Sequence, residues 1–135
     1  MMDFTFNLTM KNLKKLLPLV VILIAITTSS CKKQMLDRIH GKWKLVDIAH
    51  MDDPRADVYW EFDNSSFTIS NSNVTGEYVI QTNFNNSYLV ISKLNPDPKD
   101  NTAGKWNIVN LNKQTMTIIN KTGGGQKTRE FEKVD

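Results

Sequence analysis

The sequence predicts an all-β fold, a small up-and-down antiparallel barrel of eight strands. Hydrophobic and polar residues alternate through most of the chain after Ile39, which is typical of strands with one buried face. The alternating segments are short, and no helical pattern of useful length separates them. Consecutive strands should therefore pair antiparallel and form a closed barrel or a sandwich. With 135 residues, the chain has room for one such domain.

Strands are expected over residues 41–48, 57–62, 66–70, 76–81, 88–92, 104–110, 115–120 and 127–134. The connections after the first and fifth strands are the longest, whereas those after the second, fourth and sixth are mostly tight turns. Connections alternate between the two ends of an up-and-down barrel, which favours the barrel over a sandwich. One end should be closed by tight turns, and the other should carry the long loops.

Alternation also predicts which side chains point into the barrel. The expected inward rows are Trp43 and Leu45; Val58, Trp60 and Phe62; Phe67 and Ile69; Tyr78 and Ile80; Leu89 and Ile91; Trp106 and Ile108; Met116 and Ile118; and Phe131. An eight-stranded barrel is just wide enough to be filled by side chains or to hold one small ligand. With all three tryptophans inside, any pocket should be small and close to the long-loop end.

The N-terminal segment has the layout of an export signal. The basic MKNLKK from Met10 precedes an apolar run from Leu16 to Ile26, then TTSS and Cys31. This run of about 11 residues is shorter than the roughly 20 that a membrane-spanning helix needs, so it is typical of a signal peptide. The residues before Met10 are unusual for such a signal, so translation could begin at Met1 or at Met10.

Cys31 is the one cysteine of the chain and cannot form an internal disulfide. Its place after TTSS resembles a bacterial lipoprotein signal, with Thr28 where that family usually has leucine. The resemblance implies that Cys31 carries fatty-acyl chains such as palmitate and anchors the mature protein in a membrane. The alternative is an unmodified cysteine beside an ordinary cleavage site. The expected parts are a signal peptide (1–30), a tether with a short helical turn (31–38) and the barrel (39–135).

The segment GKWKLV opens the first strand directly after the expected helical turn. It resembles the Gly-x-Trp signature of lipocalins, in which a tryptophan fills the closed end of an eight-stranded barrel. In that superfamily an arginine of the last strand covers the tryptophan ring, a cation–π arrangement. Arg129 and Lys133, in the final TREFEKV, are the candidates to cover Trp43. The resemblance covers essentially all of residues 39–134 and implies a lipocalin-like domain.

A near copy, GKWNIV, begins at Gly104. The residues that follow the two copies share almost nothing, so internal duplication is not supported. Two strands of a small barrel have the same needs, which are a glycine where the strand starts, a lysine in water and a large ring inside. The repeat therefore indicates a shared local structure.

The lipocalin resemblance implies a small hydrophobic ligand at the long-loop end. Asp47 and Asn110 are expected to continue inward rows toward that end, and His50 and Arg55 lie in the first long loop. These four could hold a polar head group, although they also fit ordinary solvated positions. The candidate apolar lining comprises Trp60, Tyr78, Trp106 and Met116.

Composition argues against several other functions. The formal net charge is +3, but three of the 17 basic residues and one of the 14 acidic residues precede Cys31. The remainder is close to neutral and has no basic stripe for nucleic acid. The two histidines, His40 and His50, lack the paired spacing of a zinc site. We therefore expect no enzyme activity, metal or cofactor.

Two functions from different classes fit these observations. The first is a lipid-anchored carrier or sensor of a small hydrophobic ligand. The second is a filled barrel that binds another envelope protein or a glycan. In both cases the protein is exported and anchored in the cell envelope, at the periplasmic or the outer-membrane face.

Overall fold

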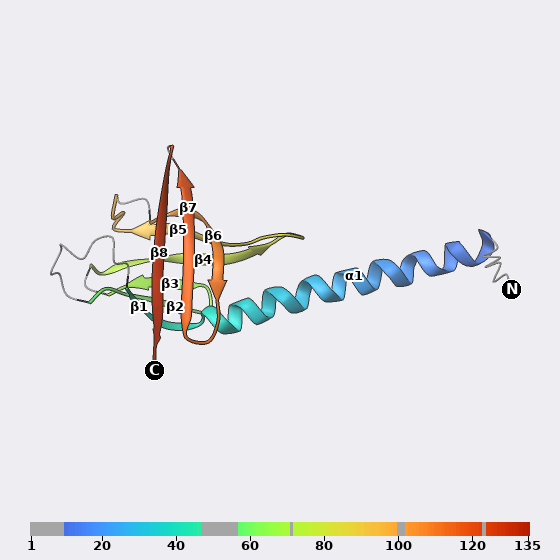
Figure 1. The fold of residues 1–135 in the computed structure, drawn as a ribbon, viewed down its shortest axis with the longest axis horizontal. Helices are drawn as coiled ribbons and strands as arrows, with labels where there is room; N and C mark the ends of the chain where they lie inside the picture. The colour runs from blue at the N-terminus through green and yellow to red at the C-terminus, as the bar shows by residue number, and fades with distance from the viewer. Residues whose placement is uncertain (1–9, 47–56, 71, 100–101, 123) are drawn as a thin grey trace, which may run out of the picture. The chain divides into compact units, whose positions relative to one another are not determined.

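The computed structural model describes residues 10–46, 57–70, 72–99, 102–122 and 124–135. These residues form the helix α1 (Met10–Ile39) and eight strands, drawn in Figure 1. The chain divides into two compact units, Met1–Cys31 and Lys32–Asp135, and the second contains the whole sheet.

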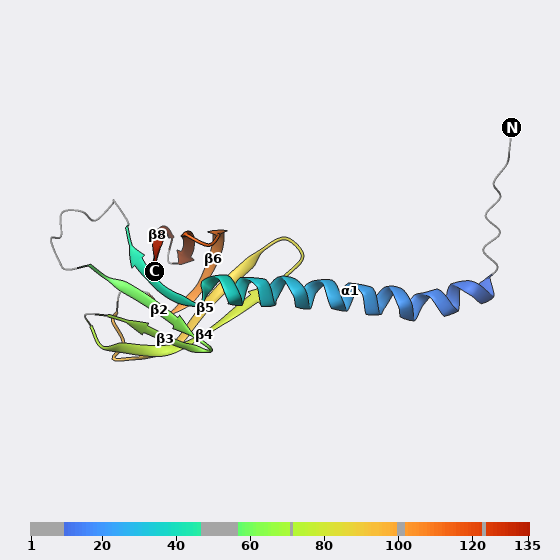
Figure 2. The ribbon, with the colours of Figure 1, turned by 90° about the horizontal axis from the view of Figure 1, so that it is seen from below.

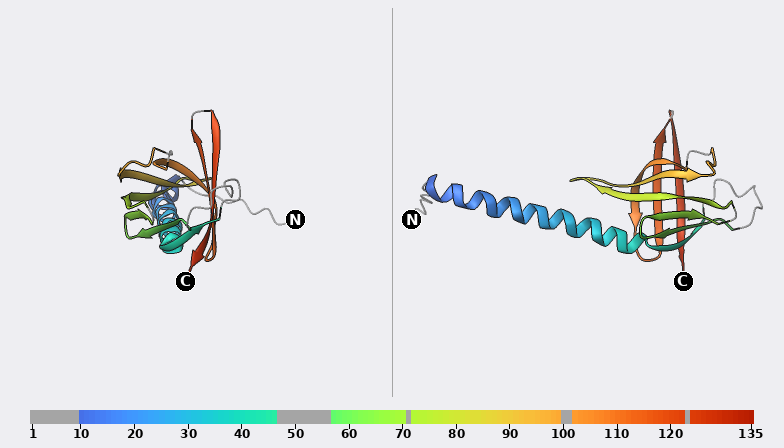
Figure 3. Two further views of the ribbon diagram at one scale, coloured as in Figure 1. Left: turned by 90° about the vertical axis from the view of Figure 1, so that its left-hand side faces the viewer. Right: turned by 180° about the vertical axis from the view of Figure 1, so that it is seen from behind.

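The strands close into a single antiparallel barrel in chain order. They are β1 (Gly41–Leu45), β2 (Tyr59–Asp63), β3 (Ser66–Ile69), β4 (Val74–Thr82), β5 (Ser87–Asn95), β6 (Gly104–Leu111), β7 (Thr115–Thr122) and β8 (Gly125–Val134). The ring is completed where β1 pairs with β8, from Lys42 opposite Val134 to Leu45 opposite Phe131. Figure 3 shows the strands from two further sides. The predicted fold class is confirmed.

The hairpin of β4 and β5 is the main departure from the predicted strand lengths. Both strands have nine residues, longer than expected from alternation. They pair with each other as far as Thr82 opposite Ser87, whereas β3 pairs with β4 only as far as Glu77. The hairpin therefore projects beyond its neighbour β3, as Figure 2 shows.

The first unit consists, where it is described, of the N-terminal part of α1. Apolar side chains of this helix are exposed, among them Leu17, Leu19 and Val21. Proline is accommodated inside the helix at Pro18. Within the described residues, α1 contains no stretch both long enough and apolar enough to cross a bilayer.

The helical turn predicted before Gly41 is longer than expected, since residues 32–39 are helical throughout. Its last turn packs on the end of the barrel. Ile39 is fully buried in the core, and Met35 and Leu36 pack against the same cluster. The Arg38 guanidinium donates a hydrogen bond of 3.4 Å to the Leu111 carbonyl. The expected polar tether is therefore, in this part, a structural cap of the barrel.

The predicted inward rows form the core. Fourteen of their sixteen side chains are buried, and Leu45 and Val58 pack against them partly buried. Aromatic rings fill the middle of the barrel. The Trp60 ring lies 4.9 Å from Phe131, 5.1 Å from Phe67 and 6.3 Å from Trp106, measured between centroids. The described interior is thus occupied by side chains, as the narrow width of an eight-stranded barrel allows.

Candidate functional site

The Gly-x-Trp segment of β1 closes the end of the barrel where the helix packs. Gly41 has a φ of 119°, a backbone conformation that favours glycine. Two residues later Trp43 is fully buried, and its indole N–H donates a hydrogen bond of 2.7 Å to the Ile39 carbonyl. The strand therefore starts with a sharp change of direction, and the ring is fixed under the helix end.

Lys133 is the basic residue that covers the tryptophan. Its ammonium lies 5.1 Å from the centroid of the Trp43 ring and donates a hydrogen bond of 3.1 Å to the Arg38 carbonyl. Arg129 lies four residues back along β8, paired with Ile118. The choice that the sequence left open is decided in favour of Lys133. A lysine here also satisfies one of the carbonyls that a helix leaves unpaired at its C-terminus.

The second copy of the segment has the same local structure. Gly104 has a φ of 122°, and the fully buried Trp106 donates its indole N–H to the Thr102 carbonyl at 2.9 Å. The side chain of Asn120, on β7, lies beside Gly104 and is 1 % exposed. Within the described part of the chain, neither polar atom of the Asn120 side chain has a hydrogen-bond partner. The predicted inward rows did not include Asn120, although it continues the alternation of Met116 and Ile118.

Of the four predicted polar residues of the long-loop end, the structure describes only Asn110. Asp47, His50 and Arg55 lie outside the described residues. The prediction that Asn110 points inward is wrong, because a β-bulge between Ile108 and Asn110 shifts the alternation and turns Leu111 into the core. Asn110 is exposed and donates a hydrogen bond of 2.9 Å to the Thr115 hydroxyl. It thus lies beside the tight β6–β7 turn, at the end opposite the long loops.

The predicted apolar lining residues are core residues. Trp60, Tyr78, Trp106 and Met116 are all buried. The Tyr78 ring packs against Phe62 with centroids 5.0 Å apart, and Met116 lies opposite Phe131 in the sheet. Their role in lining a ligand site stays a prediction.

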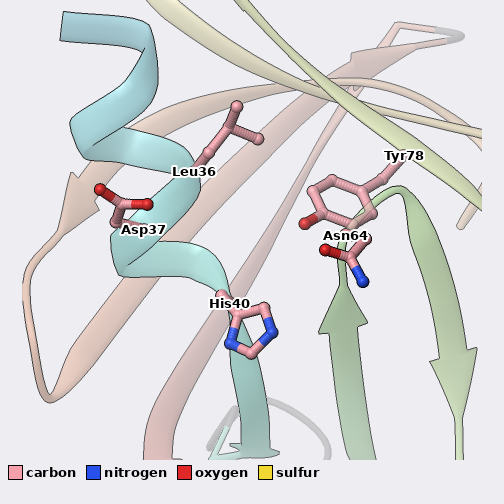
Figure 4. Close-up of a pocket in the computed structure, with 5 residues that line it drawn as sticks. All are labelled: Leu36, Asp37, His40, Asn64 and Tyr78. Atoms are coloured by element: carbon pink, nitrogen blue, oxygen red, sulfur yellow. The ribbon is translucent and has the colours of Figure 1, made fainter. Parts of the chain in front are cut away.

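A surface cavity of about 340 Å³ lies where the helix end meets the barrel. It is lined by Leu36, Asp37, His40, Asn64 and Tyr78. Figure 4 shows Leu36 and Tyr78 on opposite sides, with His40 at the end of the helix and Asn64 at the β2–β3 turn. Asn64 has a φ of 53°, a left-handed conformation that asparagine tolerates in a tight turn. The volume is at the lower end of the range of small-molecule sites.

Several side chains at this cavity can form hydrogen bonds. His40 Nε2 lies 3.1 Å from Asp63 Oδ1, and both side chains are exposed. Burial raises the pKa of the Tyr78 hydroxyl, and the negative charge of Asp63 adds to this effect. The phenol therefore stays protonated at neutral pH and can donate or accept a hydrogen bond. Leu36 supplies an apolar wall.

Sequence reasoning did not find this cavity, because it joins residues of the helix, the β2–β3 turn and β4. Tyr78 was expected inside the barrel, and His40 was considered only as a zinc ligand. A second cavity of about 300 Å³ lies on the outer face of β1 to β4, where Lys42, Tyr59 and Thr68 are among the lining residues. Among the described residues, no group of three or more His, Cys, Asp or Glu side chains is placed to hold a metal ion.

No protein-family model, curated protein or solved structure matches this chain. The closed eight-stranded antiparallel barrel is consistent with a lipocalin-like fold.

Proposed function

We propose that the protein is a lipocalin-like lipoprotein of the bacterial cell envelope, whose filled barrel is a non-enzymatic interaction module for an envelope protein or a glycan. The observation that carries the proposal is the aromatic cluster around Trp60, which occupies the barrel interior where a lipocalin ligand would lie. Binding is therefore assigned to the outer surface. The cavities at the helix end and on β1 to β4 are the concave parts of that surface.

The membrane anchor is proposed at Cys31. This cysteine is free and exposed, and it follows a helical stretch whose apolar side chains are exposed. An exposed apolar helix is stable in an apolar environment, as expected for a segment that directs the chain to a membrane. Acyl chains on Cys31 would then hold the barrel at the membrane surface.

Metabolic labelling tests the anchor. Cells that express the full chain are grown with a labelled palmitate, and the Cys31→Ser variant is the matched control. We expect label and membrane retention for the unchanged protein, and loss of both for the variant. Equal labelling of the two proteins, or no labelling of either, would remove Cys31 as the anchor.

Tryptophan fluorescence tests the filled barrel. Fatty acids, sterols, retinoids and haem are titrated into the purified protein, whose three tryptophans are all buried in the barrel. We expect no saturable change in emission and no rise in melting temperature. A saturable change with a micromolar midpoint would contradict the filled barrel.

The second candidate function is carriage of a small hydrophobic ligand at the long-loop end. The observation that favours it is the buried Asn120 amide, which lacks a partner among the described residues and lies at the Gly104 end of β6. A polar ligand group could satisfy such an amide. If the titration gives a saturable change, Asn120→Leu should abolish it and Lys133→Met should not.

A further inference from the structure

Phe84 is a fully exposed aromatic residue at the tip of the β4–β5 hairpin. The turn that carries it is fixed by its own hydrogen bonds. The Asn83 carboxamide oxygen accepts the backbone N–H groups of Asn85 at 3.1 Å and Asn86 at 2.8 Å. The Asn83 N–H donates a hydrogen bond of 2.9 Å to the Asn86 carbonyl. A large apolar ring is thus fully exposed on an ordered turn.

The hairpin carries this ring away from the barrel. Ile80 and Leu89, which face each other in the sheet, are the last buried pair along the hairpin. β4 continues two residues beyond Ile80, to Thr82, which is about 7 Å at the rise of a β-strand, and Phe84 lies in the turn beyond that point. The projecting hairpin is visible in Figures 2 and 3.

The hairpin projects from the end of the barrel where the chain arrives from Cys31. The β4–β5 turn and the start of β1 lie at the same end, because connections alternate in an up-and-down barrel. The helical residues Lys32–Ile39 number eight, so they span about 12 Å. An anchor at Cys31 therefore keeps this end of the barrel within about 12 Å of the membrane surface, which the Phe84 tip can reach.

The composition of the hairpin fits a bilayer surface. The sequence from Tyr78 to Ser92 contains no Asp, Glu, Lys or Arg. The charged residues that flank this segment in sequence, Glu77 and Lys93, form an ion pair of 2.8 Å with each other. The Lys105 ammonium of β6 lies 4.0 Å from the centroid of the Tyr88 ring, so the turn residues 83–86 are the uncharged part of the hairpin surface. The tip can therefore enter the bilayer surface without removing a charge from water, and burial of the apolar Phe84 ring there is favourable.

We propose that the Phe84 tip inserts into the surface of the bilayer that holds the anchor, and so orients the barrel with its helix end toward the membrane. This inference rests on the proposed lipid anchor at Cys31. Acyl chains at one residue hold the barrel at the membrane but do not set its orientation, so a second contact at the Phe84 tip would fix it. The opposite end of the barrel then faces away from the membrane, and the cavity on the outer face of β1 to β4 stays accessible to a partner.

Fluorescence quenching from the lipid tests the insertion. The full-length Phe84→Trp protein is isolated from membranes and reconstituted into vesicles of phosphatidylethanolamine and phosphatidylglycerol, with or without bromine on the acyl chains. The unsubstituted protein gives the background from the buried native tryptophans. Val79→Trp is the matched control, because Val79 is half-exposed on the same hairpin, below the last buried pair. Thermal melting checks that each variant folds.

We expect the brominated lipid to quench the emission added by Phe84→Trp and to leave that added by Val79→Trp unchanged. Equal quenching of both variants would mean that the barrel lies on its side and would overturn the proposal. No quenching of either, in protein that stays on the vesicles, would overturn the insertion while the anchor stands. If the isolated protein carries no acyl chain and Cys31→Ser does not change its membrane retention, the anchor itself is excluded, and this inference with it.

Discussion

The two Gly-Lys-Trp segments of the barrel have the same local structure but different surroundings. Gly41 and Gly104 have almost equal positive φ values, and each is followed by a fully buried tryptophan. Both indoles donate to the carbonyl four residues earlier. At the helix end, however, Lys133 covers the segment and is itself hydrogen-bonded, whereas Asn120 beside Gly104 has no partner in the described residues.

This difference shows what the repeated residues encode. The glycine starts a strand, and the tryptophan donates its indole N–H to the carbonyl four residues earlier. The same arrangement forms whether the strand follows a helix, as at Gly41, or a loop, as at Gly104. The side chain on the neighbouring strand then determines whether the polar groups at that end of the barrel have hydrogen-bond partners. The helix end gains a cation–π contact and a capped carbonyl, while the Gly104 end retains a desolvated amide. We therefore expect the two ends to respond differently to matched substitutions.

Removal of either indole should give the largest effect. Trp43→Ala and Trp106→Ala should each lower the free energy of unfolding by about 3 to 5 kcal/mol, because each leaves a cavity in the core. The matched variants Trp43→Phe and Trp106→Phe keep a ring but lose the N–H donor, so they should cost less. Denaturant unfolding of the four proteins measures this. An unchanged midpoint for either alanine variant would show that its indole does not fill the barrel end.

Alanine at the two glycines should give the next largest effect. Both positions have positive φ, so Gly41→Ala and Gly104→Ala should each cost about 1 to 3 kcal/mol. Gly41→Ala should cost more, since an added Cβ would lie 3.1 Å from the Lys133 side chain, against 3.7 Å from Asn120 at Gly104. Gly125→Ala is the control, because an added Cβ there meets open space. Equal stability of all three variants would mean that the glycines are not needed for the strand starts.

Substitution of Lys133 and of Asn120, the side chains beside the two segments, should change stability in opposite directions. Lys133→Met removes the cation and its hydrogen bond but keeps most of the stem, so it should destabilise by about 1 to 2 kcal/mol. Asn120→Leu replaces an unpaired buried amide by an apolar group of similar size, so it should stabilise by about 1 kcal/mol. Thermal and denaturant unfolding measure both. A destabilised Asn120→Leu protein would show that this amide is hydrogen-bonded in solution.

The sequence was sufficient to predict the barrel, because its information lies in local alternation. Trp43, Trp60 and Trp106 occupy the predicted inward positions, and the strand pairs follow in chain order. The resemblance of the Gly-x-Trp segment to the lipocalin signature, and not alternation, predicted which end Trp43 would close. These features depend on residues close in sequence, or on the period of the pleat, which one chain shows directly.

Features that depend on tertiary geometry were not predictable in the same way. Alternation placed Asn110 inside, but a β-bulge, which has no signal in these residues, exposed it. The choice between Arg129 and Lys133 needed the register of β8 on β1. The cavity at the helix end joins three elements that are distant in sequence, so neither His40 nor Tyr78 could be assigned to it beforehand.

The smallest expected difference concerns pH, and it belongs to the helix end, where Tyr78 lines the cavity. Burial raises the folded-state pKa of this phenol above its ordinary value of about 10. The stability linked to its protonated form is therefore fully present below pH 10 and is lost as the pH rises through the folded-state pKa. Tyr78→Phe should be nearly neutral at pH 7 and should lack this alkaline loss. Parallel melting curves at pH 7 and above pH 10 would reveal it, and an identical alkaline loss in both proteins would assign the effect to other groups.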